Sequence, residues 1–458
     1  MDVNQLQLLN RFGLGPSHAD VAAIAGDPHR WLEKQIDERT ASVPGEPSYK
    51  LLARQQDVVM NRQAARRAAE GNEEKIARIE EEQKKYRRQI RAVVGTQAGD
   101  RFRRAVATPT PFSERLVHFY SNHFTVSARG KPQLLSSCQA FENEAIRPFV
   151  STRFEDMLLS VISHPVMLIY LDNAQSVGPK SRLGRRGNRG LNENLAREIL
   201  ELNTLGVDGG YAQKDVVALA KMLTGWTVGN KRRPRTGEPG KFSYLEFLHE
   251  PGAQRLLGKR YANNGLEQAR TALQDLANHP ATARHLATKL ARHFVADEPP
   301  REVIDRLEKV YIASGGHLPT LHRTLLQVEL AGTQKFKTPF EYLVSLYRGF
   351  ELPTGRRGLR MATRGLRTMN HWPFTAASPA GWADKADAWA APNMLKQRID
   401  WAVAAGTYAG GRPAAEVDAA MDLMIPANAA GTRRSVARAA SASQAVAIMM
   451  ASPEMQWR

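Results

Sequence analysis

The segment GLNENLAREILELNTLG, residues 190–206, has a clear helical pattern. At about 100° per residue, charged and amide side chains fall on one arc and mostly aliphatic side chains on the other. The polar arc contains Glu193, Asn194, Arg197, Glu198, Glu201 and Thr204. The segment therefore predicts an amphipathic helix, and windows of similar composition predict further helices from end to end.

The polar arc has two interpretations. Glu193, Arg197 and Glu201 are spaced four residues apart, which is the spacing of an ordinary charge ladder on a solvated helix. The same density of carboxylates, with the amide of Asn194 beside them, also suits the wall of a reactive site. Under that second interpretation, Glu198 and Glu201 are candidate general acid/base residues.

The fold expected from these patterns is mostly α. Strictly alternating candidate strands are scarce, and 458 residues with 42% hydrophobic content are enough for a substantial core. From Tyr49 to about Val94 the composition shifts to Arg, Glu, Gln, Lys and Ala, interrupted by Gly71 and Asn72. We predict an irregular multi-helix globular domain with a projecting charged helical hairpin. The expected division is N-terminal helices over 1–48, the hairpin arm over 49–105 and a main helical domain over 106–458.

Charge and cysteine content restrict the classes of function. The 64 Lys and Arg against 46 Asp and Glu give a net charge of +18, which attracts polyanions. Since no nucleic-acid-binding motif is present, sequence-specific DNA recognition is not expected. No segment approaches the length of an apolar membrane span, and the start MDVNQLQLLN does not resemble a secretory signal. Cys138 alone forms no intrachain disulfide and is expected to pack in the core.

The segment PFSERLVHFYSNHFTVS, residues 111–127, predicts a second important helix. His118 and Asn122 fall on its polar side, whereas His123 falls among aromatic and aliphatic residues. A histidine on an apolar face either hydrogen-bonds inside the core or stays neutral at the floor of a cavity. The five-residue spacing of the two histidines separates their rings, so they do not form a zinc pair. We expect no metal and no cofactor.

The loop QSVGPKSRLGRRGNRG, residues 175–190, precedes the opening helix and is rich in glycine and arginine. Guanidinium donors on a flexible backbone, followed by a helix N-terminus, suit an anion cradle. A solvated loop is the alternative. Its candidate substrate-binding residues are Arg185, Arg186 and Arg189.

Two further segments carry residues with chemical potential. His249 and Glu250 lie together in FLHEPG, and a loop histidine beside a carboxylate can support acid/base chemistry, although adjacent side chains seldom face one target. Trp382 lies in the Pro-rich segment NHWPFTAASPAGWADKADAW, residues 370–389. Aromatic residues there either line a sugar-binding cleft or cover the core.

Together, LLNRFGLGP, ERLVHFYSNHFTVS, GLNENLAREILELNTLGVDGGY, FLHEPG and SPAGW resemble the bacterial domain of unknown function 1800 family. The resemblance covers nearly the whole chain. It implies a soluble, helix-rich protein and a frequent genomic companion similar to sulfatases and phosphatases, and it brings no established activity. Asn203 stands where many members have histidine, and Glu250 where aspartate is common. If that histidine binds metal elsewhere, this chain binds metal poorly.

Three functions are compatible with these features. The first is a hydrolase or lyase acting on an acidic polymer such as a polysaccharide. In it, Glu198 or Glu201 acts as general acid/base with His123 or His249 as partner. The arginines neutralise acid groups, and the other candidates for substrate binding are Asn194, Arg197, His118, Asn122 and Trp382. The second is a non-catalytic partner or export escort of the companion protein. The third is a non-specific binder of nucleic acid or anionic membrane. Cytoplasmic residence is expected, with co-export beside the companion as the alternative.

The arginine-rich loop generates a first prediction. Replacing Arg185, Arg186 and Arg189 with Ala should weaken binding to an acidic polymer and flatten its salt dependence, because fewer counterions are exchanged. Thermal stability should stay nearly unchanged, since the charges are expected to be solvated. Binding titrations at several salt concentrations check this, and unaltered binding at low salt would remove the loop from the site.

Overall fold

The computed structural model describes residues 3–24, 26–38, 41–131, 134–187, 190–409, 411 and 413–458. Helices make up 63% of the residues and strands 4%, which confirms the predicted mostly α fold. Among the described residues, four short strands form two antiparallel two-stranded sheets. They are β1 (Trp226–Val228) with β2 (Phe242–Tyr244), and β3 (Gln254–Leu256) with β4 (Lys259–Tyr261).

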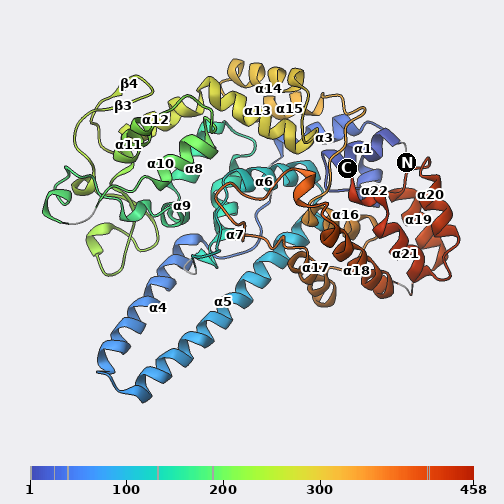
Figure 1. The fold of residues 1–458 in the computed structure, drawn as a ribbon, viewed down its shortest axis with the longest axis horizontal. Helices are drawn as coiled ribbons and strands as arrows, with labels where there is room; N and C mark the ends of the chain where they lie inside the picture. Colours follow the sequence, from blue (N-terminus) through green and yellow to red (C-terminus); the bar gives the residue numbers. More distant parts are fainter. Residues whose placement is uncertain are drawn as a thin grey trace.

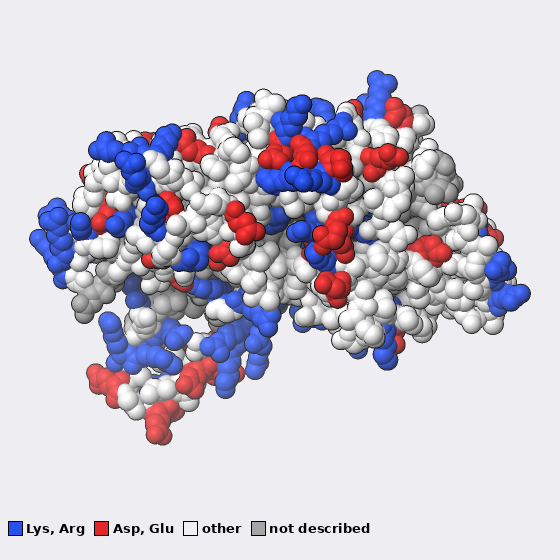
Figure 2. All heavy atoms as spheres, turned by 45° about the horizontal axis from the view of Figure 1, so that its top comes forward, with Lys and Arg blue, Asp and Glu red and all other residues white. Residues whose placement is uncertain are grey.

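The predicted charged hairpin is present as two long helices that project from the body (Figure 1). They are α4 (Ser48–Ala68) and α5 (Glu73–Ala107). Asn72 caps α5 by accepting a hydrogen bond from the Lys75 backbone at 3.0 Å. Side chains of both charges cover the arm, with acidic ones at its tip (Figure 2). One face of its last turns, including Ala98, Phe102 and Ala105, is buried, so this helix is both an arm and part of the core.

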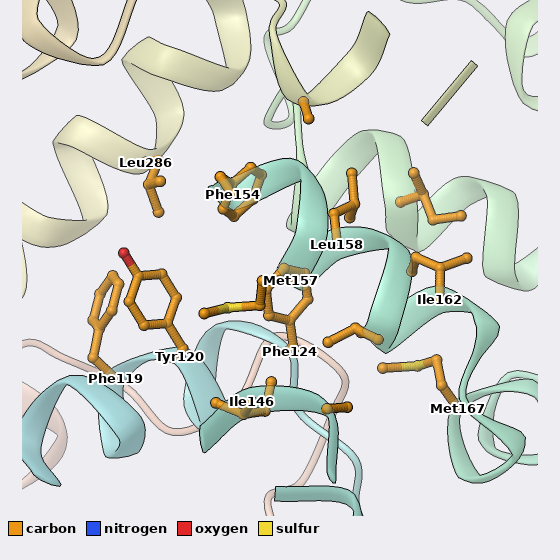
Figure 3. Close-up of a cluster of buried hydrophobic side chains, with 14 of the residues drawn as sticks. Phe119, Tyr120, Phe124, Ile146, Phe154, Met157, Leu158, Ile162, Met167 and Leu286 are labelled. Carbon is orange, nitrogen blue, oxygen red and sulfur yellow. The ribbon is translucent and has the colours of Figure 1, made fainter. Parts of the chain in front are cut away.

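The body contains two clusters of buried apolar side chains. The first cluster includes residues between Phe12 and Leu330 and is built mainly on helices before α16. Its helical members lie mainly on α3 (Pro28–Asp37), α6 (Pro111–His123), α7 (Cys138–Phe141), α8 (Phe154–Ser163), α9 (Pro165–Tyr170), α10 (Asn194–Glu198), α11 (Gln213–Leu223), α12 (Leu266–Ala277), α13 (Pro280–Phe294), α14 (Arg301–Ala313) and α15 (Leu318–Leu326). Leu8 of α1 (Val3–Arg11) packs against this cluster, and α2 (His18–Ile24) connects α1 to α3. At its centre, Tyr120 of α6 and Phe124, which follows α6, lie beside Phe154 and Met157 of α8 (Figure 3).

The second cluster joins Leu14, Phe102 and Ala105 to residues 340–455. Its helices lie together at the C-terminal end of the molecule (Figure 1). They are α16 (Pro339–Gly349), α17 (Arg356–Thr368), α18 (Pro392–Ala409), α19 (Ala414–Met424), α20 (Ala430–Ala437), α21 (Ala442–Ala451) and α22 (Pro453–Gln456). The predicted main domain over 106–458 therefore contains more than one hydrophobic centre.

The expected continuous helix over 190–206 is only partly correct. The regular helix begins at Asn194, where the backbone N–H donates to the side chain of Asn192 at 2.9 Å. It covers only α10, and residues Ile199–Asn203 form a π-helical turn, η6. A second π-helical turn, η2 (Glu142–Ile146), follows α7. Single π-helical turns are rare and often occur at functional sites.

Buried ion pairs join the two clusters. Arg115 of α6, which is 2% exposed, donates to the carboxylate of Glu341 at the start of α16. Arg458 lies 3.1 Å from the same carboxylate and also donates to the carbonyl of His293 at 2.9 Å. Burial opposes ionisation of Glu341, yet Arg458 and Arg115 hold its pKa well below the ordinary value. One carboxylate thus neutralises two arginines inside the protein.

A second prediction concerns the group of Arg115, Glu341 and Arg458, which we call the ionic joint. Glu341→Gln should lower the free energy of unfolding by about 3–5 kcal/mol, because it leaves two buried arginines without a counter-charge. The exposed pair of Arg78 and Glu74, with both side chains 76% exposed, provides the control. Glu74→Gln should cost less than about 1 kcal/mol. Urea unfolding measures both, and equal small losses would contradict a structural role for the joint.

Candidate functional site

A cavity of about 100 Å³ lies beside the ionic joint, between α6, α13, α16, the base of α5 and the segment 371–384. Such a volume holds a few water molecules or one small chemical group. The charged and histidine residues on its wall are Arg101, Arg115, His118, His293, Glu341, His371 and Asp384. No other described pocket combines histidines with a carboxylate partner in this way, so this cavity is the candidate site.

His293 and Asp384 form an imidazole–carboxylate pair on this wall. His293 Nδ1 lies 2.8 Å from Asp384 Oδ1, while Nε2 is buried with no hydrogen-bond partner among the described residues. Burial lowers the pKa of His293 more than Asp384 raises it, so the ring is neutral near pH 7. Nδ1 then carries the hydrogen that is donated to Asp384, and Nε2 keeps a free lone pair. A general base has this arrangement.

His371 has the opposite tautomer. Its Nδ1 accepts a hydrogen bond from the Phe340 backbone N–H at 3.2 Å, which leaves the hydrogen on Nε2. Burial lowers its pKa to about 3, so it too is neutral. The ring packs against Trp382 at 4.7 Å and Trp389 at 4.9 Å between centroids. The cavity wall thus contains one imidazole acceptor and one imidazole donor.

Arg101 supplies a positive charge to the cavity. Its Nε donates to Glu142 at 2.9 Å, and its guanidinium lies over the rings of Phe340 and Phe374. In the part of the chain that the structure describes, its terminal NH groups have no hydrogen-bond partner. Glu142, on η2, also accepts from Ser121 at 2.9 Å and Arg147 at 3.1 Å. The π-helical turn thus places the carboxylate that orients Arg101.

The sequence-predicted residues His118, Asn122 and Trp382 all line this cavity. His118 is not solvated: its side chain is 12% exposed and lies 3.4 Å from Glu114, and burial lowers its pKa. Asn122 uses both ends of its amide on the backbone of Trp382, donating at 2.9 Å and accepting at 2.7 Å. Asn122 therefore positions the 381–384 loop, and its amide is not free to bind a substrate.

The structure gives His123 different neighbours from those of the predicted acid/base carboxylates. His123 is buried; its Nε2 lies 3.1 Å from the Asn203 carbonyl, and Asn203 donates back to the His123 carbonyl at 3.4 Å. Burial and repulsion from Glu201 raise the pKa of Glu198. No hydrogen bond or ion pair among the described residues joins His123 to either carboxylate. Their joint catalytic role stays a prediction.

The helix surface around those carboxylates carries an ordinary charge pair. Arg197 lies 3.0 Å from Glu193 and also donates to Gln213 at 2.9 Å. Asn194 is exposed at the first position of α10. These contacts correspond to the charge-ladder interpretation of the polar arc, and a role of Asn194 and Arg197 in substrate binding stays a prediction.

His249 and Glu250 connect two loops in the structure. His249 Nδ1 donates to the Thr224 carbonyl at 2.9 Å, and Glu250 accepts from the Lys180 backbone at 2.7 Å. Both residues are buried and face different partners. Glu250 thereby anchors the arginine-rich loop, whose Arg185 and Arg186 are exposed. Arg189 lies outside the described residues.

Comparison with known protein families identifies the family of this chain. The sequence model of the family described as protein of unknown function (DUF1800) matches residues 7–457. The chain belongs to this family. No curated protein and no solved structure matches it.

Two structural findings concern classes of function for this DUF1800 member. Within the described ranges, no three His, Cys, Asp or Glu side chains are grouped to hold a metal ion. No described helix has the length and apolar content needed to cross a bilayer. The expected independence from metal stays a prediction that elemental analysis can test.

Sequence reasoning missed most of the cavity wall in this family member. His285, Lys289 and His293 recur every four residues and so lie on one face of α13, a signal that was present in the sequence. Asp384 follows Trp382 by two residues in SPAGWADK. No local pattern relates these positions to Arg101, because 192 residues of chain separate Arg101 from His293.

A third prediction concerns the buried histidines. Burial lowers the pKa to about 4 for His285 and to about 3 for His322 and His371. The unfolded chain takes up protons at these histidines below about pH 6.5, whereas the folded chain does not. Their contribution to the free energy of unfolding is therefore fully present at neutral pH. It should fall on acidification by about 1.4 kcal/mol per pH unit for each histidine.

Urea unfolding between about pH 7 and about pH 5 measures this slope. His322 bonds to Tyr120 at 2.9 Å and lies outside the cavity, so His322→Gln isolates one histidine. In this variant, the slope of the free energy of unfolding against pH should correspond to the uptake of one proton fewer than in the wild-type protein. Stability that stayed constant over this interval would contradict the neutral assignment.

Proposed function

We propose that this protein is an acid–base enzyme of hydrolase or lyase type that acts on an acidic substrate in the cavity. One observation carries the proposal: His293, whose ring is oriented by Asp384 and whose buried Nε2 has no partner among the described residues, lines a cavity that Arg101 also lines. A buried polar atom without a partner is costly in a folded protein. It is accounted for if the partner is a substrate or a reacting water.

The roles follow from the charges on the wall. Arg101 binds the carboxylate of the substrate through its free NH groups, with Glu142 holding the guanidinium in place. His293 Nε2 accepts a proton, either from the attacking water in a hydrolysis or from the carbon next to the carboxylate in an elimination. The C–O bond to the departing sugar then breaks, and the imidazolium returns the proton to the departing oxygen. Asp384 stabilises the imidazolium that forms, and His371 Nε2–H is available to donate a hydrogen bond to a developing oxyanion.

The size of the cavity restricts the substrate. A volume of about 100 Å³ admits one small group, so a polysaccharide would enter by its end rather than along its length. An acidic polysaccharide remains the substrate class that we favour, because the cavity pairs a guanidinium with a base and the chain is strongly basic. Trp382, packed on His371, would cover one sugar ring at the entrance.

The proposal predicts the effect of two substitutions. Oligomers of galacturonate, alginate and hyaluronan serve as substrates, with reducing ends reporting hydrolysis and ultraviolet absorbance of unsaturated uronates reporting elimination. His293→Gln should lower kcat/KM at least about 100-fold, the usual contribution of a general base. Asp384→Asn should also lower it, because the amide no longer stabilises the imidazolium.

Glu198→Gln and Glu201→Gln are the matched comparisons, since these carboxylates were the sequence-based candidates. If they abolish activity while His293→Gln does not, the site lies on α10 and η6 instead. If none of the variants differs from the wild-type protein on any of these substrates, the non-catalytic partner role is favoured.

A further inference from the structure

Helix α17 carries five arginines on one face. At about 100° per residue they all fall within an arc of about 100°, and each is exposed. They are Arg356, Arg357, Arg360, Arg364 and Arg367. The opposite face, which includes Ala362 and Leu366, is buried in the second hydrophobic cluster. We call these five residues the arginine stripe.

No carboxylate of the described chain forms an ion pair with the arginine stripe. Asp400, on the neighbouring α18, is instead paired with Lys396 at 2.7 Å. Arg367 lies over the ring of Trp372, with 4.0 Å between its guanidinium carbon and the ring centroid. The stripe is therefore a line of positive charge that its own fold does not neutralise.

Local electrostatics disfavour this helix. Arg356 and Arg360, and Arg360 and Arg364, are like charges four residues apart, which destabilise a helix. Two arginines occupy the first turn, where the helix dipole favours anions, and no acidic residue is present there. An anion bound along the stripe would relieve both effects. The charges therefore indicate a ligand, because the helix would be more stable without them.

Packing explains the two glycines of α17, and no such explanation exists for the arginines. A Cβ on Gly358 would lie 1.7 Å from the Pro353 carbonyl oxygen. On Gly365 it would lie 2.7 Å from the ring of Trp401. The buried face is thus constrained by close contact, whereas the exposed face is open to any residue.

The helix that carries the stripe lies beside the candidate site. The backbone N–H of His371, on the cavity wall, donates to the Leu366 carbonyl in the last turn of α17 at 2.8 Å. On its other side α17 packs on α5 at Gly99, two residues before Arg101. A groove of about 560 Å³ between α17 and α18 includes three arginines, Arg357, Arg360 and Arg364, and one carboxylate, Asp400, in its wall. Helix α17 therefore forms part of the groove and also contacts two elements of the cavity wall.

We propose that the arginine stripe is the binding subsite for an acidic polysaccharide chain whose end enters the cavity. This inference rests on the proposed function, which sets the direction in which the polysaccharide is bound. Guanidinium groups at helical spacing can each pair with successive carboxylate or sulfate groups. Single-stranded nucleic acid would require exposed aromatic faces for stacking. Trp401 is 7% exposed and Trp372 is covered by Arg367, so the stripe favours the polysaccharide.

The test compares two triple variants with the same change in charge. Arg357, Arg360 and Arg364 are replaced with Gln in one, and the exposed arm residues Arg66, Arg67 and Arg88 in the other. Binding of a fluorescent polygalacturonate is titrated at several salt concentrations, with single-stranded DNA as the rival ligand. The stripe variant should lose at least about tenfold in affinity and show a flatter salt dependence. The arm variant should bind nearly as tightly as the wild-type protein.

Equal losses in both variants, or no binding of polygalacturonate by the wild-type protein, would overturn the proposal. Tighter binding of DNA through the same three arginines would assign the stripe to nucleic acid instead. Circular dichroism and urea unfolding confirm that α17 is intact in the stripe variant.

His293→Gln separates this inference from the proposed function. It should retain full polygalacturonate binding while lacking activity. If the wild-type protein binds polygalacturonate through the stripe but has no activity, the binding subsite is supported and the proposed enzymatic function is rejected. Activity on short oligomers that is insensitive to the stripe variant, with polygalacturonate binding also unchanged, would reject the subsite and keep the enzyme.

Discussion

The structure depends on the carboxylate of Glu341, which neutralises Arg115 and Arg458 inside the protein. Apolar contact alone does not fix the relative orientation of the two hydrophobic clusters, because such contact is not directional. Charged hydrogen bonds are directional and costly to leave unpaired when buried. The joint therefore sets how α6, α13 and α16 meet, and the cavity lies where these helices meet.

The same joint explains the electrostatic character of the cavity. Burial keeps the histidines neutral. The neighbouring cationic groups keep Glu341 and Asp384 ionised despite the desolvation of these carboxylates. A neutral imidazole next to an ionised carboxylate is the combination that a general base requires. The same buried charges thus contribute to the stability of the fold and to the proposed chemistry. The amide of Asn122, which bonds to the Trp382 backbone, holds the irregular 371–384 segment against α6.

The helical content and the projecting arm were predictable from residue patterns. Helical periodicity and the run of charged residues after Tyr49 are local signals, and local signals suffice to recognise amphipathic helices. The π-helical turns η2 and η6 were not predictable in this way, since a single wider turn leaves the residue pattern almost unchanged. His118, Asn122 and Trp382, the sequence-based candidates for substrate binding, all line the candidate cavity, and the amide of Asn122 is used on the Trp382 backbone. Their role in binding a substrate stays a prediction.

By itself the sequence determined the secondary-structure class, the strong positive charge and, through motifs spread along the chain, membership of the DUF1800 family. These properties depend on composition and on spacings within one helix or one motif. Only the tertiary structure decided that Arg101, His293 and Asp384 share one cavity and that the arginines of α17 lack carboxylate partners among the described residues. Contacts between residues hundreds of positions apart depend on how helices pack, and helix packing depends on the shapes and charges of all the faces that meet. A pattern read along a single chain does not contain that information.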